Sequence, residues 1–183
     1  MKRALFTLLA PLACAACQTQ AGPGPSAPPG VSASSLTVTS KTFASKGTIP
    51  VDNSCDGSDR SPQLTWSSPP EGTKSIAIVA EDPDAPSGSF THWVVYGVPP
   101  ETTSIAEGVD PGTLGARVGM NDFKSVRYAG PCPPRRELHR YVFRVFALNA
   151  PIDLPEGATK ETLYANLNAH VLAEGYAVGT FSR

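Results

Sequence analysis

The sequence predicts a mostly β domain with one helix near its C-terminal end. Glycine and proline are abundant, with 16 and 19 copies among 183 residues, where their usual combined share is roughly 12%. This excess favours a turn-rich fold over a helical bundle. Short apolar runs rich in β-branched and aromatic residues recur along the chain, as expected for strands. A single stretch carries apolar residues at helical spacing.

Five segments have the pattern of strands. In chain order they are Leu36–Thr39, Ser75–Ala80, His92–Val98, Tyr141–Leu148 and Tyr176–Phe181. The second is almost wholly apolar, which predicts a central strand buried on both faces. In the fourth, the odd-numbered positions share one face and Arg144 lies on the other. Prolines follow the third and fourth segments and are expected to end them.

The helix is predicted to run from Thr159 to Glu174. Apolar residues recur there every four positions, at Leu163, Leu167 and Val171. Thr159 is a suitable N-cap, and Gly175 is a suitable stop after the last turn.

The charge balance excludes several classes of protein. The chain has 15 basic and 16 acidic residues, for a formal net charge of -1. This balance argues against a nucleic-acid-binding protein, which normally has a basic excess. A hydrophobic content of 40% argues against an acidic disordered chain. No apolar run reaches the roughly 20 residues that a membrane-spanning helix needs.

The N-terminal residues have the pattern of an export signal. Lys2 and Arg3 precede an apolar run, Ala4–Ala16, which has the length of a secretory signal and is too short to span a bilayer. The small residues before Cys17 resemble the lipobox of bacterial lipoproteins, in which the cysteine becomes the lipidated first residue. Residues 1–17 are therefore predicted to be a lipoprotein-type signal peptide with Cys17 as the acceptor.

Two alternatives stay open for this segment. Cys14 is a second candidate acceptor, and ordinary cleavage after Ala15 would release a soluble periplasmic protein. Residues 18–35, rich in Gly, Pro, Ser and Ala, are predicted to be a flexible tether. Residues 36–183 then form one folded domain. We expect an exported bacterial protein, anchored to a membrane by its N-terminal lipid and facing the periplasm or the cell exterior.

Export changes how the remaining cysteines are interpreted. Cys55 and Cys132 would lie in a compartment where disulfides persist, so a disulfide between them is the simplest prediction. Two free buried thiols are the alternative. A metal site is not expected, because neither cysteine has a second Cys or a His at ligand spacing.

Two segments carry polar residues that a plain sheet does not need. The first is Glu81–Pro86, followed by His92, and the second is Tyr128–Tyr141, which contains His139. Loops that follow the strands of a rigid sheet often build a pocket. Each residue also has a structural interpretation: the aspartates cap turns, the histidines start strands and the tyrosines pack in the sheet.

These two segments resemble the signature regions of the phosphatidylethanolamine-binding protein family, and most closely its bacterial Raf-kinase-inhibitor-like branch. The matching residues are Asp82–Pro86, His92, Gly130–Pro134 and His139–Tyr141. The resemblance implies a large antiparallel sheet packed on a smaller one, with peripheral helices. It also implies an anion pocket for phosphate, acetate or a phospholipid headgroup. Carried over by position, the pocket residues are Asp82, Asp84, His92, Tyr128, Pro133, His139 and Tyr141.

The resemblance implies a binding protein without a cofactor and not an enzyme. Inhibition of a protease or kinase is the alternative, a hydrolase is less favoured, and homodimers are frequent in this branch. We expect the aspartates to orient the imidazoles and to raise their pKa, so that charged donors face the anion. The chain departs from the family pattern at Lys124 and Arg136, where glycine is frequent. Arg135 and Arg136 would add positive charge at the pocket mouth.

Overall fold

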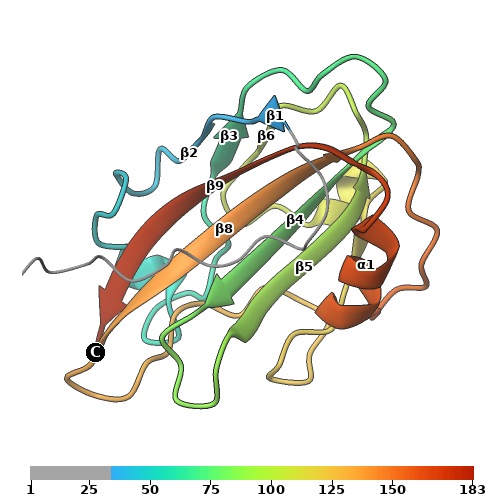
Figure 1. The fold of residues 1–183 in the computed structure, drawn as a ribbon. Coiled ribbons are helices and arrows are strands. Elements are labelled where there is room, and N and C mark those ends of the chain that lie inside the picture. The colour runs from blue at the N-terminus through green and yellow to red at the C-terminus, as the bar shows by residue number, and fades with distance from the viewer. Residues whose placement is uncertain (1–33) are drawn as a thin grey trace, which may run out of the picture.

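The computed structural model describes residues 34–183, which form two β-sheets (Figure 1). The larger sheet has the strand order β1-β9-β8-β4-β5-β7, and the smaller has the order β2-β3-β6. Their bounds are β1 Ser34–Ser35, β2 Val38–Thr39, β3 Leu64–Trp66, β4 Ser75–Asp82, β5 Phe90–Val98, β6 Ser104–Ile105, β7 Arg117–Val118, β8 Leu138–Leu148 and β9 Val171–Ser182. The predicted signal peptide, the lipidation at Cys17 and most of the tether lie outside the described residues.

The apolar β4 lies in the middle of the larger sheet, between β5 and β8. Its side chains alternate between two buried clusters because successive residues of a strand point to opposite faces. Ile76 and Ile78 join Trp66 of the smaller sheet in the cluster between the sheets. Ala77 and Val79 join the cluster on the opposite face. The prediction of a central strand buried on both faces is therefore confirmed.

The helix α1, Lys160–Leu167, covers that opposite face. It begins as predicted, because the Thr159 hydroxyl accepts a hydrogen bond from the Thr162 amide. Leu163 and Leu167 are buried against the sheet. Lys160 adds an ion pair to Glu81 of β4, with 2.8 Å between Nζ and Oε1. Two short 3₁₀ helices complete the helical content of the described residues, η1 at Val51–Asn53 and η2 at Pro111–Leu114.

The predicted C-terminal end of the helix is wrong. The helix ends at Leu167, seven residues before the predicted Glu174. Residues 171–174 belong instead to β9, in which Val171 pairs with Leu148 of β8. Buried and less buried residues alternate along β9. Val171 fits both a four-residue and a two-residue repeat, and the long ladder with β8 decides in favour of the strand.

The fold class is confirmed as mostly β, with a large sheet, a small sheet and a helix late in the chain. One detail differs, because β1 pairs in parallel with β9 and makes the large sheet mixed. The strands also run further than predicted at one end of the sheet. Asp82 is the last residue of β4, and His92 and His139 lie inside β5 and β8 near their first residues. No helix among residues 34–183 is long and apolar enough to cross a membrane.

Candidate functional site

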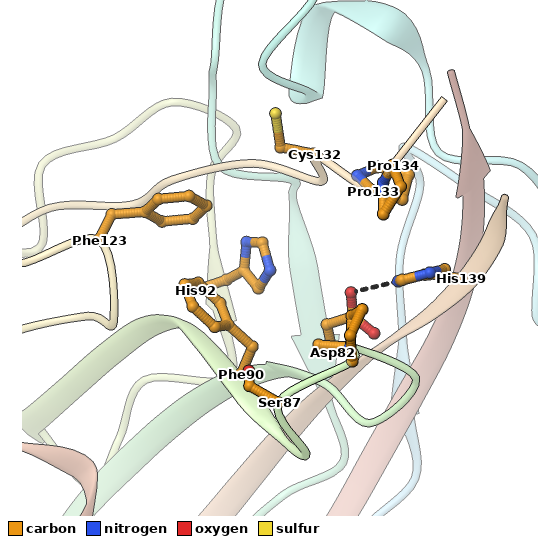
Figure 2. Close-up of a pocket in the computed structure, with 11 residues that line it drawn as sticks. Asp82, Ser87, Phe90, His92, Phe123, Cys132, Pro133, Pro134 and His139 are labelled. Atoms are coloured by element: carbon orange, nitrogen blue, oxygen red, sulfur yellow. Dashed lines mark hydrogen bonds and ion pairs between the residues drawn. The ribbon is translucent and has the colours of Figure 1, made fainter. Parts of the chain in front are cut away.

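A pocket of about 270 Å³ lies at the end of the larger sheet where β4 stops and β5 and β8 start (Figure 2). It is lined by Asp82, Ala85, Pro86, Ser87, Phe90, His92, Phe123, Cys132, Pro133, Pro134 and His139. Antiparallel pairing brings these segments together, because Asp82 pairs with Phe90 and β4 also pairs with β8. The lining therefore combines two histidines and a carboxylate with apolar side chains.

Asp82 and His139 form the best-defined polar contact of the pocket. The Nδ1 atom of His139 lies 2.7 Å from Asp82 Oδ2, and both side chains are buried. The other ring nitrogen, Nε2, lies 3.3 Å from the exposed Glu137 carboxylate. Burial lowers the pKa of His139, but its contacts with Asp82 and Glu137 outweigh burial and raise it overall. The expectation that an aspartate raises an imidazole pKa holds in direction for this histidine.

His92 is in a different electrostatic state. Burial lowers the pKa of His92. The carbonyl of Ala129 and the charge of Asp82 raise it, but they offset the effect of burial only in part. The expected rise in pKa is therefore wrong for His92, because its ring is buried among aromatic side chains. The centroid of its ring lies 5.2 Å from the ring centroid of Tyr141 and 5.5 Å from those of Phe90 and Phe123, and all three pairs are edge to face.

The orientation of the His92 ring follows from one backbone contact. Its Nδ1 lies 2.7 Å from the carbonyl oxygen of Ala129, so a neutral ring donates its proton there. In such a neutral ring Nε2 carries no proton and is an acceptor. The pocket thus holds one imidazole favoured as a cation and one favoured as a neutral ring.

Asp84 supports the rim of the site and does not line the pocket. Its carboxylate accepts hydrogen bonds from the Arg140 backbone amide at 2.9 Å and from the guanidinium at 2.6 and 2.8 Å. The hydrogen bond from Arg140 is the main reason why the pKa of Asp84 is lowered. This contact ties the loop after β4 to β8.

The two predicted tyrosines also lie outside the lining. The Tyr128 hydroxyl donates a hydrogen bond to the Asn53 carbonyl at 3.0 Å, and its ring packs against Trp93. Tyr141 is buried beneath His92, and its hydroxyl has no hydrogen-bond partner among the described residues. Burial, followed by the charge of Asp82, raises the pKa of Tyr141. Burial also raises the pKa of Tyr128, so both hydroxyls stay protonated. Tyr128 acts through its hydrogen bond and its packing, and Tyr141 acts through packing.

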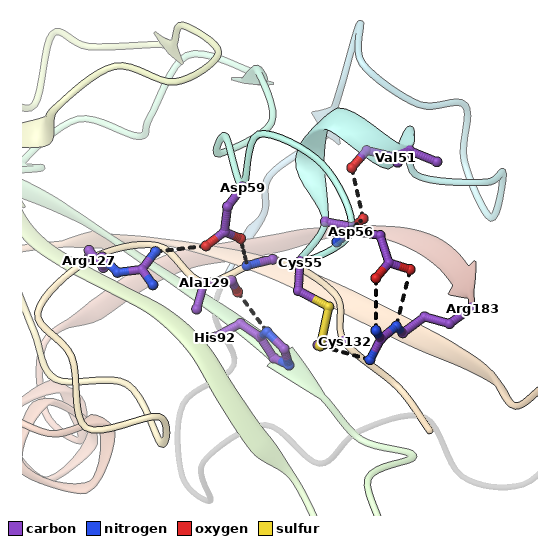
Figure 3. Close-up of a disulfide and its surroundings, with 11 residues drawn as sticks. Val51, Cys55, Asp56, Asp59, His92, Arg127, Ala129, Cys132 and Arg183 are labelled. Carbon is purple, nitrogen blue, oxygen red and sulfur yellow. Dashed lines mark hydrogen bonds and ion pairs between the residues drawn. A yellow bond between two sulfur atoms is a disulfide. The ribbon is translucent and has the colours of Figure 1, made fainter. Parts of the chain in front are cut away.

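The predicted disulfide between Cys55 and Cys132 is present, with 5.5 Å between the two Cα atoms (Figure 3). Cys132 lines the pocket, so the disulfide joins one pocket wall to the segment after η1. Arg183, the last residue, reinforces this joint. Its guanidinium pairs with Asp56 at 2.8 Å and lies 3.4 Å from Cys132 Sγ.

Asp59 also stabilises the pocket wall that contains Cys132, through contacts with the residues just before it. Its carboxylate accepts a hydrogen bond from the Gly130 amide at 2.6 Å and pairs with Arg127 at 2.7 Å (Figure 3). Since the neighbouring Ala129 carbonyl orients His92, Asp59 positions the imidazole through one residue of backbone.

The structure therefore brings together Asp82, His92, Pro133 and His139 of the predicted site. Sequence reasoning missed Phe90, Phe123 and Glu137, as well as Asp59 behind the wall. Glu137 stands two residues before His139, so its proximity was available as a signal. Phe90 likewise stands two residues before His92. Phe123 had no such signal, because it reaches the pocket through the fold. No group of three or more His, Cys, Asp or Glu side chains within residues 34–183 is arranged to hold a metal ion.

The two sheets, with a pocket at one end of the larger sheet, define a mostly β binding protein. A family model for phosphatidylethanolamine-binding protein matches residues 39–182. The chain belongs to this family. A UPF0098 protein of Aquifex aeolicus is 43% identical over 152 residues, which cover 81% of this chain and 89% of that protein.

Solved structures agree with this membership. The phosphatidylethanolamine-binding protein homologue CT736 from Chlamydia trachomatis is 34% identical, with a TM-score of 0.76 over 82% of this chain and 99% of that chain. E. coli YbcL, described as a member of the mammalian PEBP family, is 31% identical, with the same TM-score and coverage.

Proposed function

We propose that this protein is an exported binding protein, not an enzyme, whose pocket takes a small anion such as phosphate or a phospholipid headgroup. The observation that carries the proposal is the His139 ring, which Asp82 favours as a cation at the pocket wall. A protonated imidazole donates from both nitrogens, and Nε2 would donate to an anion that displaces Glu137. The apolar walls suit the carbon atoms attached to a headgroup phosphate.

The hydroxyl chemistry of the pocket supports binding over hydrolysis. Ser87 is the only hydroxyl side chain in the lining, and it makes no hydrogen bond to either imidazole in the described part of the chain. A serine nucleophile would need such a base within hydrogen-bond reach. An esterase assay of wild type and His139→Ala tests this point, and activity lost with His139 would contradict the binding proposal.

Affinity for inorganic phosphate is expected to fall as pH rises through the pKa of His139. That pKa is raised above its ordinary value of about 6.5, so the loss falls on the alkaline side of that value. The contribution of His139 to the free energy of unfolding has the same pH dependence. It is fully present below the pKa of His139 in the unfolded chain and is lost as pH rises through the pKa of His139 in the folded protein. Calorimetry across pH measures the affinity. His139→Gln should remove this step in affinity, and a wild-type affinity independent of pH would count against the proposal.

Glu137→Gln is expected to tighten phosphate binding by up to about fivefold, the equivalent of ~1 kcal/mol for an exposed ion pair. The Glu137 carboxylate contacts His139 Nε2, the nitrogen that would donate to an anion. Calorimetry should be done at a pH where His139 is protonated in both proteins, because Glu137 also raises the pKa of His139. Glu101→Gln removes the same charge outside the pocket lining and serves as the control. Unchanged or weaker binding by Glu137→Gln would show that the carboxylate does not compete.

Export and the lipid anchor belong to the same proposal. The basic residues, the apolar run and Cys17 support them. Mass spectrometry of the N-terminal peptide from membranes tests the anchor: lipid on Cys17 supports it, and an unmodified Cys17 would contradict it.

A further inference from the structure

Apolar side chains are exposed around the mouth of the pocket. Phe123 is 47% exposed, and Pro134 is exposed as well. Phe123 lies on one side of the pocket, and Pro134 lies on the other (Figure 2). Both residues belong to the connection between β7 and β8 and flank one opening, so exposed apolar surface lies on two sides of it.

Basic residues come directly after Phe123 and Pro134 in the chain. Lys124 follows Phe123, and Arg135 and Arg136 follow Pro134. All three basic residues are exposed. Their side chains make no ion pair or hydrogen bond with any residue in the described range 34–183.

Two of these cations occupy backbone positions that favour glycine. Lys124 has φ 62° and Arg136 has φ 70°. The left-handed region is strained for residues that have a Cβ atom, whereas glycine adopts it freely. A glycine at either position would relieve this strain and would remove a cation from the mouth.

The carboxylates around the mouth are already engaged. Glu137 and Asp82 contact His139, and Asp84 pairs with Arg140. Asp122, next to Phe123, accepts a hydrogen bond from the Thr91 amide. Within residues 34–183, Asp122 is the one of these carboxylates without an ion pair or a histidine contact, against the three basic residues Lys124, Arg135 and Arg136, so the excess charge is positive.

We propose that this mouth, formed by Phe123, Lys124, Pro134, Arg135 and Arg136, docks on the surface of an anionic lipid bilayer. Apolar side chains can enter the boundary between headgroups and acyl chains, while basic side chains are attracted to anionic headgroups. The combination of exposed apolar groups with unpartnered cations at one opening favours a bilayer over an acidic protein. The inference rests on the proposed function, because docking would turn the headgroup pocket toward the lipid headgroups.

A tryptophan at position 123 reports this docking directly. The two native tryptophans, Trp66 and Trp93, are buried, so in Phe123→Trp the exposed indole is the one that responds to lipid. The full chain is mixed with vesicles of equal parts phosphatidylcholine and phosphatidylglycerol. We expect a blue shift of the emission and quenching by brominated acyl chains. Both signals should weaken with added salt and with vesicles of phosphatidylcholine alone.

The glycine variants separate charge from folding. Lys124→Gly and Arg136→Gly are each expected to weaken partitioning onto the anionic vesicles about fivefold, the contribution of one basic residue near such a surface. Their thermal midpoints should be unchanged or higher, because the backbone strain is relieved. Lys46→Gly is the matched control: Lys46 is also exposed, has φ 59° and lies outside the pocket lining. It should bind vesicles as the wild type does.

Several results would overturn the proposal. These are the absence of a blue shift at position 123, wild-type partitioning by both glycine variants, or an equal loss in Lys46→Gly. Binding of polyglutamate without vesicle binding would assign the mouth to an acidic protein and would also overturn it. Calorimetry of wild type with phosphoethanolamine tests the pocket separately. Binding of phosphoethanolamine without vesicle docking would refute only the docking, and docking without phosphoethanolamine binding would refute only the proposed pocket ligand.

Discussion

Replacement of Cys55 and Cys132 by serine is expected to lower the free energy of unfolding by up to about 4 kcal/mol. The disulfide joins residues 77 positions apart, and the chain-entropy model assigns roughly this stabilisation to a loop of that size. The shape of the pocket should change as well, because Cys132 is part of its lining. Phosphate affinity is therefore expected to fall even where the variant remains folded.

Urea denaturation of wild type and of Cys55→Ser/Cys132→Ser measures the stability, and calorimetry measures the affinity. Wild type treated with a reductant is a second test, since it loses the bond and keeps both sulfur atoms. A destabilisation below about 1 kcal/mol in both samples would mean that the loop is closed as firmly by its other contacts, such as the pair between Asp56 and Arg183.

The sequence was sufficient to predict the disulfide and the central strand for simple reasons. Only two cysteines remain outside the signal region, so one pairing exists, and an apolar run such as Ser75–Ala80 has few places in a small protein except the middle of a sheet. The end of the helix was beyond local reasoning. Val171 satisfies two periodicities, and a partner strand from elsewhere in the chain decides between them.

The pocket was predictable only where a motif residue lies at the end of a strand. Asp82, His92 and His139 meet because three strands share one end of the sheet. Tyr128 belongs to the same motif region, but its hydroxyl is turned to the Asn53 carbonyl. The opposite pKa shifts of the two histidines could not be predicted either, because they depend on which ring has a carboxylate beside it and which has aromatic rings.

Gly130→Ala is expected to lower the free energy of unfolding by about 3 kcal/mol, in the range of severe overpacking. A Cβ atom at residue 130 would collide with the Asn53 carbonyl oxygen and would lie 2.8 Å from Ser54 Cα. These are backbone atoms, which cannot swing aside as a flexible side chain can. The same Cβ would lie 2.9 Å from Asp59 Oδ1, the atom that holds the Gly130 amide.

The pocket should respond to this substitution because the displaced wall includes the carbonyl of Ala129 that orients His92. We expect weaker phosphate binding together with the lost stability. Gly112→Ala is the control, since the nearest atoms to its new Cβ belong to the Asp110 side chain, the closest at 3.2 Å, and it should cost less than about 1 kcal/mol. Urea denaturation and calorimetry compare the three proteins. If Gly130→Ala proved as stable as Gly112→Ala, the segment after η1 would have to yield readily, and the wall that it shares with Cys132 could not be the rigid side of the pocket.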